Sequence, residues 1–558
     1  MKENFTDDKK QNINKKSEID KETESFMAYM DEKEREEAEL ETCFPDIEEE
    51  EETVLPFECY DPDTGEYDEK RATEYFNRTK IIEKKKITID KDDNITIEKT
   101  TERAVTKKNG EKSDKNGDKR ERIIIDGQKD LEGNDAVLNV IEDGQKEIGK
   151  LCREILDYFK QNLLIKDDNM IYIPYATLVS HMYPGDTVWT IIVGQSSGGK
   201  SEILRSMGEG RNDFIYPISR ITQNAVISGT KGNVGIVYEA NNKVVIIKDL
   251  VTAITSKNAE GIFSQIREAF DGSVNVSSGY EDGSKSKEGI RVTIIAGVTP
   301  DAISGNTIFN SALGERFIYY MYPKFDISNI DILAEKMMGG PDDDKRRKNV
   351  YAISEKLIKK VFELRKLCFK NNVKAIIGDI EYGRWLYRLG ALVAILRRSV
   401  TYNWKANIIE DIGTEEGPHR ITKELLKMSV GIAIVKQKPI RGVTDVDEEI
   451  KNDIKRICVD SIPRRRFMCL KLFMNEQKDM IKRGRKDVMV TTIKNRMALE
   501  FGFSRNTARM IVNELAEMNI LRFYGDEDND GDHRIVILNE NFIKNHSKTL
   551  NMLIEYVK

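Results

Sequence analysis

The sequence is poor in cysteine and histidine, with only 6 Cys and 4 His among its 558 residues. The cysteines form no C-x-x-C pair and no dense spacing, which argues against a zinc site and against a disulfide-stabilised secreted domain. No apolar run is long enough to span a bilayer, and the first residues include no apolar signal region. We therefore expect a cytoplasmic protein with no membrane partner.

Charge is also unevenly distributed along the chain. Residues 1–60 contain 21 Asp or Glu and 8 Lys or Arg, a local balance of −13, whereas the whole chain carries −7. Residues 1–135 lack the apolar density of a folded core, so we expect them to be mostly disordered, with a short helix near residues 22–40 and weak strand-like pieces near residues 86–98.

One segment fills every fixed position of the phosphate-binding loop pattern G-x-x-x-x-G-K-[S/T]. An apolar strand is expected before it at residues 188–193, and a helix after it from residue 202. Backbone N–H groups of such a loop close around phosphates at the positive end of the helix dipole. We expect Lys200 to reach the β- and γ-phosphates of ATP and the Ser201 hydroxyl to bind Mg²⁺. The predicted nucleotide-binding residues are Gly194, Gln195, Ser196, Ser197, Gly198, Gly199, Lys200 and Ser201.

Two further apolar runs end in polar residues. Residues 243–247 lead into Asp249, which we expect to hold Mg²⁺ opposite Ser201; the alternative is a carboxylate that only caps the next helix. Residues 291–297 lead into Thr299, which is expected near the γ-phosphate.

The order of these motifs resembles that of AAA+ ATPases, in particular the minichromosome maintenance helicases and the helicase-like ATPases of phages and mobile elements. The resemblance covers about residues 172–320: the phosphate loop, the acidic strand end, residues 266–272, a Gly/Ser/Lys-rich segment, a sensor strand and Leu-Gly-Glu-Arg-Phe at residues 313–317. It implies that Arg316 is an arginine finger that enters the ATP site of a neighbouring subunit.

The sequence departs from that family at two positions. The residue after Asp249 is Leu250 where a catalytic glutamate is usual, and Thr299 stands where an asparagine is usual. Either another carboxylate is the base, with Glu268 and Glu239 as candidates, or hydrolysis is slow and the protein is a nucleotide-gated clamp.

The Gly/Ser/Lys-rich segment at residues 273–289 resembles the channel hairpin with which these helicases contact DNA. Lys285 and Lys287 are the predicted phosphate contacts and Tyr280 a possible stacking group; the alternative is a solvated loop.

Helical patterns surround this core. Residues 136–164 predict a leading helix, and residues 349–369, 382–400 and 416–435 predict a helical lid. From the lid, Arg397 or Arg398 either reaches the γ-phosphate as a second sensor or faces solvent.

The C-terminal part is a basic module. Residues 461–525 contain 14 Lys or Arg and 6 Asp or Glu. Helices are expected at residues 464–475, at 491–498 and from Ser504, followed by strands at 520–524 and 534–538, a layout that resembles winged-helix domains. On the third helix we expect Arg505, Asn506 and Arg509 to contact DNA; docking of another protein is the alternative.

Together these patterns predict an α/β P-loop AAA+ core with a helical lid, a disordered acidic N-terminal region and a C-terminal winged-helix domain. The disordered N-terminal region is expected at residues 1–135 and the ATPase core with its leading helix at residues 136–325. The helical lid is expected at residues 326–455 and the winged-helix domain at residues 456–558. We expect a DNA-dependent ATPase that forms a homo-oligomeric ring such as a hexamer and works as a replicative helicase or helicase-like motor. The catalytic residues would be Lys200, Asp249, Arg316, Glu268 and Thr299.

Two other functions are considered. One is an ATP-switched initiator or helicase loader. The other, a small-molecule kinase, is disfavoured by the Leu-Gly-Glu-Arg-Phe motif at residues 313–317 and by the basic C-terminal module. The acidic N-terminal region either contacts replication proteins or the basic module, or is a solubilising tail.

Overall fold

The computed structural model describes residues 79–89, 95–105, 131–196, 198–208, 213–219, 221, 236–256, 258–270, 272–276, 285–304, 316–323, 343–403, 408–414, 416–482, 488–524 and 534–557. The chain divides into two compact units, Met1–Asp135 and Ala136–Lys558. Each unit is described by itself.

The centre of the second unit is a five-stranded sheet in the order β4-β5-β8-β3-β9, and every neighbouring pair is parallel. This confirms the predicted α/β class. The predicted strands at residues 188–193, 243–247 and 291–297 are β3, β5 and β8. The strands are β3 Trp189–Val193, β4 Ile215–Ile218, β5 Val244–Ile247, β8 Thr293–Val298 and β9 Ile318–Met321.

Both faces of the sheet are covered, because side chains alternate between two apolar clusters with the period of two that a strand imposes. Ile192 and Ile295 face the larger cluster, which includes α4 and the long helices. Trp189 and Ile294 face the smaller cluster, which includes α9. The sheet is therefore buried on both sides, which explains why β3 and β8 read as continuous apolar runs in the sequence.

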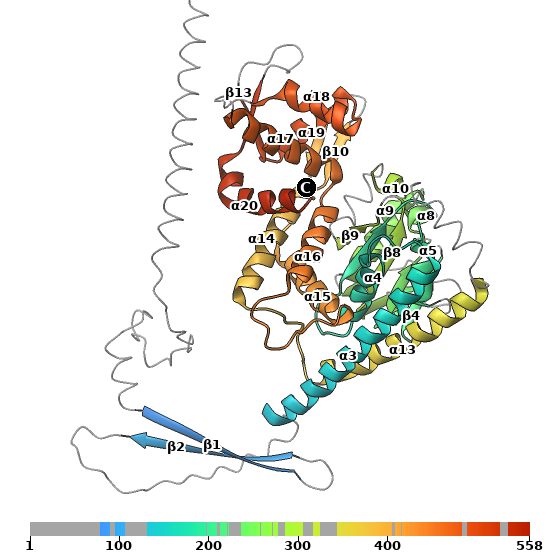
Figure 1. Cartoon of the computed structure of the whole chain (residues 1–558), viewed down its shortest axis with the longest axis vertical. Helices are drawn as coiled ribbons and strands as arrows, with labels where there is room; N and C mark the ends of the chain where they lie inside the picture. The colour runs from blue at the N-terminus through green and yellow to red at the C-terminus, as the bar shows by residue number, and fades with distance from the viewer. Residues whose placement is uncertain are drawn as a thin grey trace, which may run out of the picture. The chain divides into compact units, whose positions relative to one another are not determined.

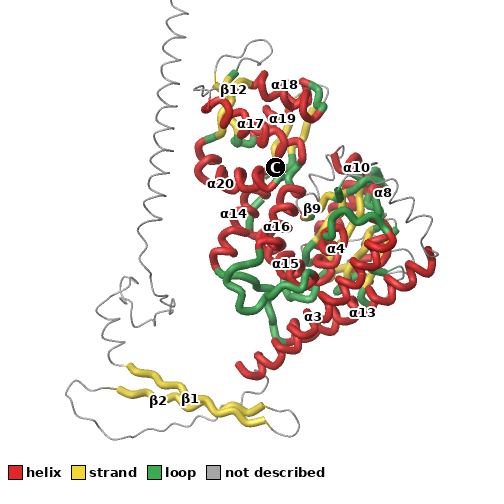
Figure 2. Tube along the Cα trace, viewed as in Figure 1, coloured by secondary structure: helices red, strands yellow, loops and turns green. Residues whose placement is uncertain are grey.

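Three helices pack on the face of the sheet that contributes to the larger apolar cluster. The predicted leading helix is α3, and the helix predicted at residues 349–369 is α13. Leu364 of α13 lies so close to Gly144 of α3 that a Cβ on this glycine would be 2.7 Å from it. Figures 1 and 2 show α3 and α13 with α4 beside the sheet. Their bounds are α3 Leu131–Asn162, α4 Asn169–Ser180 and α13 Asp343–Lys370.

Short helices connect the strands of the sheet. They are α5 Lys200–Ser206, α7 Ile236–Glu239, α8 Val251–Ile254, α9 Ala259–Phe270 and α10 Pro300–Ser304.

After α13, the region expected to be a lid contains the helices predicted at residues 382–400 and 416–435, together with the start of a further helix and a hairpin that the sequence did not predict. The helices are α14 Ile380–Leu396, α15 His419–Val435 and α16 Glu448–Ser461, and the hairpin pairs β10 Val400–Asn403 with β11 Ile408–Ile412. Helix α16 covers the edge of the sheet, because the Met321 N–H donates to Asp460 at 2.8 Å and the Tyr319 N–H donates to Ser461 at 3.0 Å. It crosses the domain boundary expected at residue 456.

The C-terminal module contains the three predicted helices and the predicted strand pair. The pair is extended by β12 and followed by α20, neither of which was predicted. The elements are α17 Arg464–Lys482, β12 Val488–Met489, α18 Val490–Phe501, α19 Arg505–Glu517, β13 Leu521–Tyr524, β14 Ile535–Leu538 and α20 Glu540–Tyr556. In Figure 1 helices α17, α18 and α19 gather in one cluster.

Two further hairpins are antiparallel. In the first unit, β1 Thr79–Ile89 pairs with β2 Ile95–Val105, so the strand-like pieces expected near residues 86–98 belong to two longer strands joined there. In the second unit, β6 Ser273–Val276 pairs with β7 Lys285–Glu288, which confirms a hairpin at residues 273–289. The helix expected near residues 22–40 lies outside the described residues.

Candidate functional site

The loop at residues 194–201 joins the buried strand β3 to helix α5. The Gly194 N–H donates to the Val298 carbonyl of β8 at 3.1 Å, and the Gly198 N–H donates to Gln195 O at 3.2 Å. Gly199, the residue before α5, has a φ of +83°, a left-handed conformation that favours glycine. The three glycines thus allow the chain to form a compact turn directly at the carboxyl end of β3.

The Lys200 side chain lies inside this turn. Its Nζ donates to the carbonyl oxygens of Gly194 at 2.6 Å and Gln195 at 2.7 Å, and the residue is only 7% exposed. Burial lowers the pKa of Lys200, and the nearby Asp249 carboxylate opposes that shift. The ammonium group is therefore held at the loop by neutral carbonyls, within the electrostatic reach of a carboxylate from a different strand.

Asp249 follows the carboxyl end of β5 and is exposed to solvent. Its Oδ1 accepts a hydrogen bond from the Val251 N–H at 2.9 Å at the start of α8. Asp249 thus accepts from the first backbone N–H of α8, although the N-cap residue is Leu250 and no side chain caps the helix. Because one lone pair of one oxygen is used in that bond, the rest of the carboxylate is able to bind a cation.

Thr299 comes directly after β8, the strand that lies between β5 and β3 in the sheet. The Leu250 N–H donates to Gly297 O at 2.9 Å, so the ends of β5 and β8 are tied together. A Cβ on Gly297 would lie 2.8 Å from Lys248 O, which explains why glycine stands there. Lys200, Asp249 and Thr299 are therefore all at the carboxyl edge of the sheet, the edge where ligands bind in open α/β folds.

A bidentate ion pair that sequence reasoning missed holds the helix behind the loop. Arg347 of α13 donates to both carboxylate oxygens of Glu202 at 3.0 Å, and Arg205 donates to Glu202 at 3.1 Å. Glu202 follows Ser201, so the pair fixes α5 against α13. The partners are 145 residues apart in the sequence, and no local pattern connects them.

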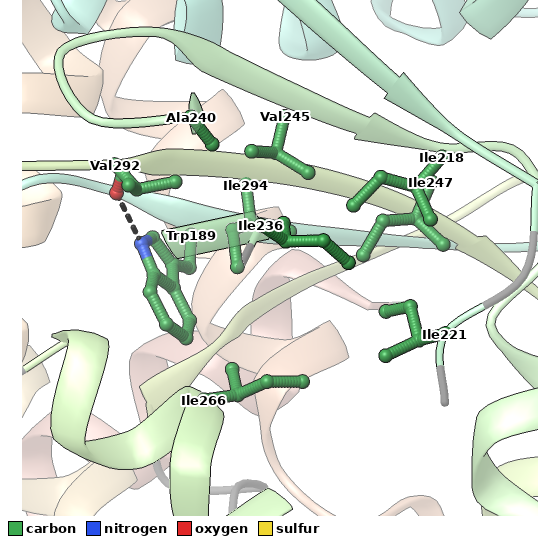
Figure 3. A pocket seen from close by; sticks show the side chains of 10 residues that line it. All are labelled: Trp189, Ile218, Ile221, Ile236, Ala240, Val245, Ile247, Ile266, Val292 and Ile294. Atoms are coloured by element: carbon green, nitrogen blue, oxygen red, sulfur yellow. Dashed lines mark hydrogen bonds between the residues drawn. The ribbon is translucent and has the colours of Figure 1, made fainter. Parts of the chain in front are cut away.

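The two candidate bases do not lie at this edge. Glu268 lies near the end of α9, four residues before Gly272, whose carbonyl oxygen accepts from the Ile290 N–H at 3.0 Å just ahead of β8. On the same helix, Ile266 lines a cavity of about 40 Å³ against the sheet with Trp189 and Ile247 (Figure 3). Glu239 precedes β5, and it accepts a hydrogen bond from Tyr216 at 2.7 Å. Both carboxylates therefore lie toward the amino edge, and neither placement fits a base for the loop of its own chain.

Arg316 is also at the amino edge. Ile318 of β9 is paired in register with Thr190 of β3, so Arg316 lies level with the residues before β3. The path along β3 from there to the phosphate-binding loop is roughly 20 Å at about 3.3 Å per residue. An arginine side chain is much shorter than that path, so Arg316 cannot reach the loop of its own chain.

Arg397 is neither a solvent-facing arginine nor a sensor at the loop. It is 7% exposed and donates through Nε and Nη2 to Glu416 Oε2, at 3.0 and 2.7 Å, and through Nη1 to Phe317 O at 3.3 Å. Arg398 donates to Gly413 O in the β10–β11 region at 3.0 Å. Arg397 therefore lies at the amino edge, so it neither faces solvent nor reaches the phosphate-binding loop of its own chain.

The predicted DNA contacts fall on two elements. Lys285 and Lys287 belong to strand β7, and Tyr280 lies outside the described residues. Ser504 caps α19 by accepting from the Thr507 N–H at 3.0 Å, which confirms the predicted helix start. Ala508, Ile511, Val512 and Leu515 are buried as expected, while Arg505 and Asn506 are exposed and Arg509 is half-buried. These three side chains are placed on the outer part of the first turns of α19.

Comparison with known proteins adds no assignment, because no protein-family model and no curated protein matches the sequence. Among the helices in the described ranges, none combines the length and the apolar character needed to cross a membrane.

Proposed function

We propose that the chain is a DNA-dependent AAA+ ATPase that acts as a homo-oligomeric ring and is a helicase or helicase-like motor. The observation that carries the proposal is the separation of two groups of residues. Lys200, Asp249 and Thr299 gather at the carboxyl edge of the sheet, and Arg316 lies at the opposite edge. A site that needs all four groups is complete only between two chains.

The loop has the features that a nucleotide triphosphate requires. The loop makes a compact turn into the start of α5, with Gly199 in a left-handed conformation, and Lys200 supplies a positive charge inside the turn. Ser201 is exposed at the start of α5, and Asp249 is exposed nearby, so one hydroxyl and one carboxylate oxygen are available to Mg²⁺. In this proposal Lys200 and the loop hold the phosphates, and bound Mg²⁺ neutralises their charge.

The DNA-binding part of the proposal is supported by exposed basic and polar groups. Arg505 and Asn506 are exposed at the start of the third helix of the C-terminal module, where recognition helices meet base edges. The β6–β7 hairpin, with Lys285 and Lys287, is a second candidate contact with the phosphate backbone.

Trans complementation tests the proposal. Lys200→Ala removes the charge that holds the phosphates, and Arg316→Ala removes the finger, so each variant alone should lose ATP turnover, the second by about a thousandfold or more. Mixed oligomers of the two variants should regain part of the activity, because some interfaces then combine an intact loop with an intact finger. Wild-type turnover by Lys200→Ala refutes the nucleotide site, and absence of rescue in exchanging oligomers refutes action between chains.

A second function, an ATP-switched initiator or helicase loader, is favoured by one observation. Leu250 follows Asp249, and Glu268 and Glu239 both lie away from the loop, so no candidate base of the described chain stands beside its own phosphate site. Strand displacement on forked DNA with ATP separates the two functions: a motor releases the displaced strand, whereas a switch binds the fork without unwinding it.

A further inference from the structure

A buried polar cluster joins the segment that carries Arg316 to the end of helix α14. Arg397, the residue directly after α14, donates to the carbonyl oxygen of Phe317 at 3.3 Å. Phe317 is the next residue after Arg316, and its ring is 1% exposed and packs at 5.3 Å from Trp189. The backbone on the carboxyl side of Arg316 is therefore fixed by a ring contact and by one guanidinium.

The orientation of Arg397 is itself fixed by an acid. Glu416 accepts from both Nε and Nη2 of Arg397, and its other oxygen accepts from Arg420. The side chains of Arg397 and Glu416 are 3% and 9% exposed. A buried, charge-assisted pair with this geometry strongly restricts where the guanidinium points.

The backbone of Arg397 is held as well. Arg466 of α17, which is 2% exposed, donates through Nη1 to Leu396 O at 2.7 Å and to Arg398 O at 2.6 Å. These are the residues on either side of Arg397. The main chain around Arg397 is thus held by Arg466 of α17, and its guanidinium is held by Glu416, which lies just before α15.

We propose that Arg397 is a positioning residue for Arg316: it holds the Phe317 carbonyl so that the preceding arginine projects correctly toward the ATP site of the neighbouring chain. The inference rests on the proposed ATPase function and gives Arg397 a role other than the second sensor that the sequence suggested. An arginine finger stabilises charge only when its guanidinium is placed closely, and a displacement of about 1 Å costs about a hundredfold in rate.

The test compares steady-state ATP hydrolysis by full-length oligomers. Arg397→Met keeps most of the side-chain volume but removes the donor to Phe317. We expect kcat to fall by about a hundredfold, with a KM for ATP within about twofold of the wild type, because the loop that binds ATP in the same chain is untouched. Arg384→Met is the matched control on α14, since Arg384 is exposed and, among the described residues, forms an ion pair with the exposed Glu381. This variant should keep wild-type turnover.

Mixing experiments distinguish positioning from a general loss of structure. Arg397→Met mixed with Lys200→Ala should regain turnover, because Lys200→Ala chains supply an intact finger to the intact loops of the other variant. Arg397→Met mixed with Arg316→Ala should not, because both variants lack the same half of the site. Rescue in both mixtures, or in neither, overturns the inference, as does an Arg397→Met kcat within threefold of the wild type.

A second variant covers the case in which Arg397→Met fails to fold. Glu416→Gln leaves Arg397 in place but removes the negative charge that orients it, and the same pattern of rescue is expected with a smaller fall in kcat. If Arg316→Ala itself keeps wild-type activity, the proposed function fails. If Arg316→Ala is inactive while Glu416→Gln and Arg397→Met are fully active, the positioning inference alone fails.

Discussion

Replacing Glu514 should destabilise the C-terminal module far more than its single charge suggests. Glu514 of α19 is 0% exposed and accepts hydrogen bonds from Arg466 and from the Tyr402 hydroxyl, with Arg465 at 3.5 Å. Glu514→Ala leaves the Arg466 guanidinium buried without its counter-charge. Breaking a buried pair from one side costs about 3–5 kcal/mol, because the remaining ion cannot regain its hydration.

The exposed pair between Glu381 and Arg384 on α14 provides the control. Both side chains are more than 60% exposed, at 64% and 62%, and exposed pairs contribute about 0.2–1 kcal/mol. Glu381→Ala should therefore change stability by less than about 1 kcal/mol. The two substitutions remove the same type of ion pair and differ mainly in burial.

Replacing both partners of the buried pair should recover only part of the loss. In Arg466→Met/Glu514→Leu no charge is left buried, which removes the largest penalty. The carbonyls of Leu396 and Arg398 still lose the donor that Arg466 supplies, and each unsatisfied buried acceptor costs about 1–3 kcal/mol. The double variant should therefore be more stable than Glu514→Ala and less stable than the wild type.

Hydrogen exchange is the appropriate assay, since a chain of several units does not unfold in one transition. A loss of about 3–5 kcal/mol accelerates exchange of protected amides in α17 and α19 by a few hundredfold to a few thousandfold. Amides of α4, far from the substitution, serve as an internal reference. Exchange in α17 and α19 that is no faster in Glu514→Ala than in Glu381→Ala refutes the reasoning.

Two further substitutions probe a buried carboxyl group of α15 and the end of β8 beside the nucleotide site. Glu424 is buried and neither of its carboxylate oxygens has a hydrogen-bond partner among the described residues; burial raises its pKa to about 8 from 4.5. Because the folded state then binds more protons than the unfolded state between these values, stability should fall as pH rises, by up to about 1.4 kcal/mol per pH unit. Glu424→Gln should therefore flatten the pH dependence of the amide-exchange protection factors of α15 between pH 5 and 7. Equal slopes for the two proteins contradict this. Gly297→Ala places a Cβ 2.8 Å from Lys248 O and 2.9 Å from Leu204, so the end of β5 before Asp249 must shift. Titration with a fluorescent ATP analogue should then show weaker binding. Unchanged affinity argues against a role for this strand end in nucleotide binding.

Local patterns in the sequence predicted the elements whose determinants are local. The apolar run before Gly194 is β3, and Ser504 with its apolar spacing marks the start of α19. Helix α20 was not predicted, although Phe542, Leu550, Leu553 and Ile554 recur at helical spacing in the sequence and are buried in the structure.

The position of each carboxylate relative to the sheet was not readable from the sequence. Glu268 stands in a motif beside the acidic strand end, yet the direction of α9 carries it to the amino edge. The pair between Arg397 and Glu416 is likewise invisible to periodicity, since it depends on how α14 ends beside the start of α15. Such placements follow from strand order and helix packing, which local propensities do not determine.

The separation of Lys200 and Arg316 follows from the parallel sheet itself. In parallel strands all carboxyl ends share one edge, so a residue just before β9 and a residue just after β3 are on opposite sides although their strands are neighbours. A head-to-tail arrangement places the amino edge of one chain against the carboxyl edge of the next, and it closes into a ring when its rotation is a whole fraction of a turn. If this chain hydrolyses ATP through both residues, the amino edge of one chain must meet the carboxyl edge of another, and a dimer that buries only the amino edges, or only the carboxyl edges, against each other would be inactive.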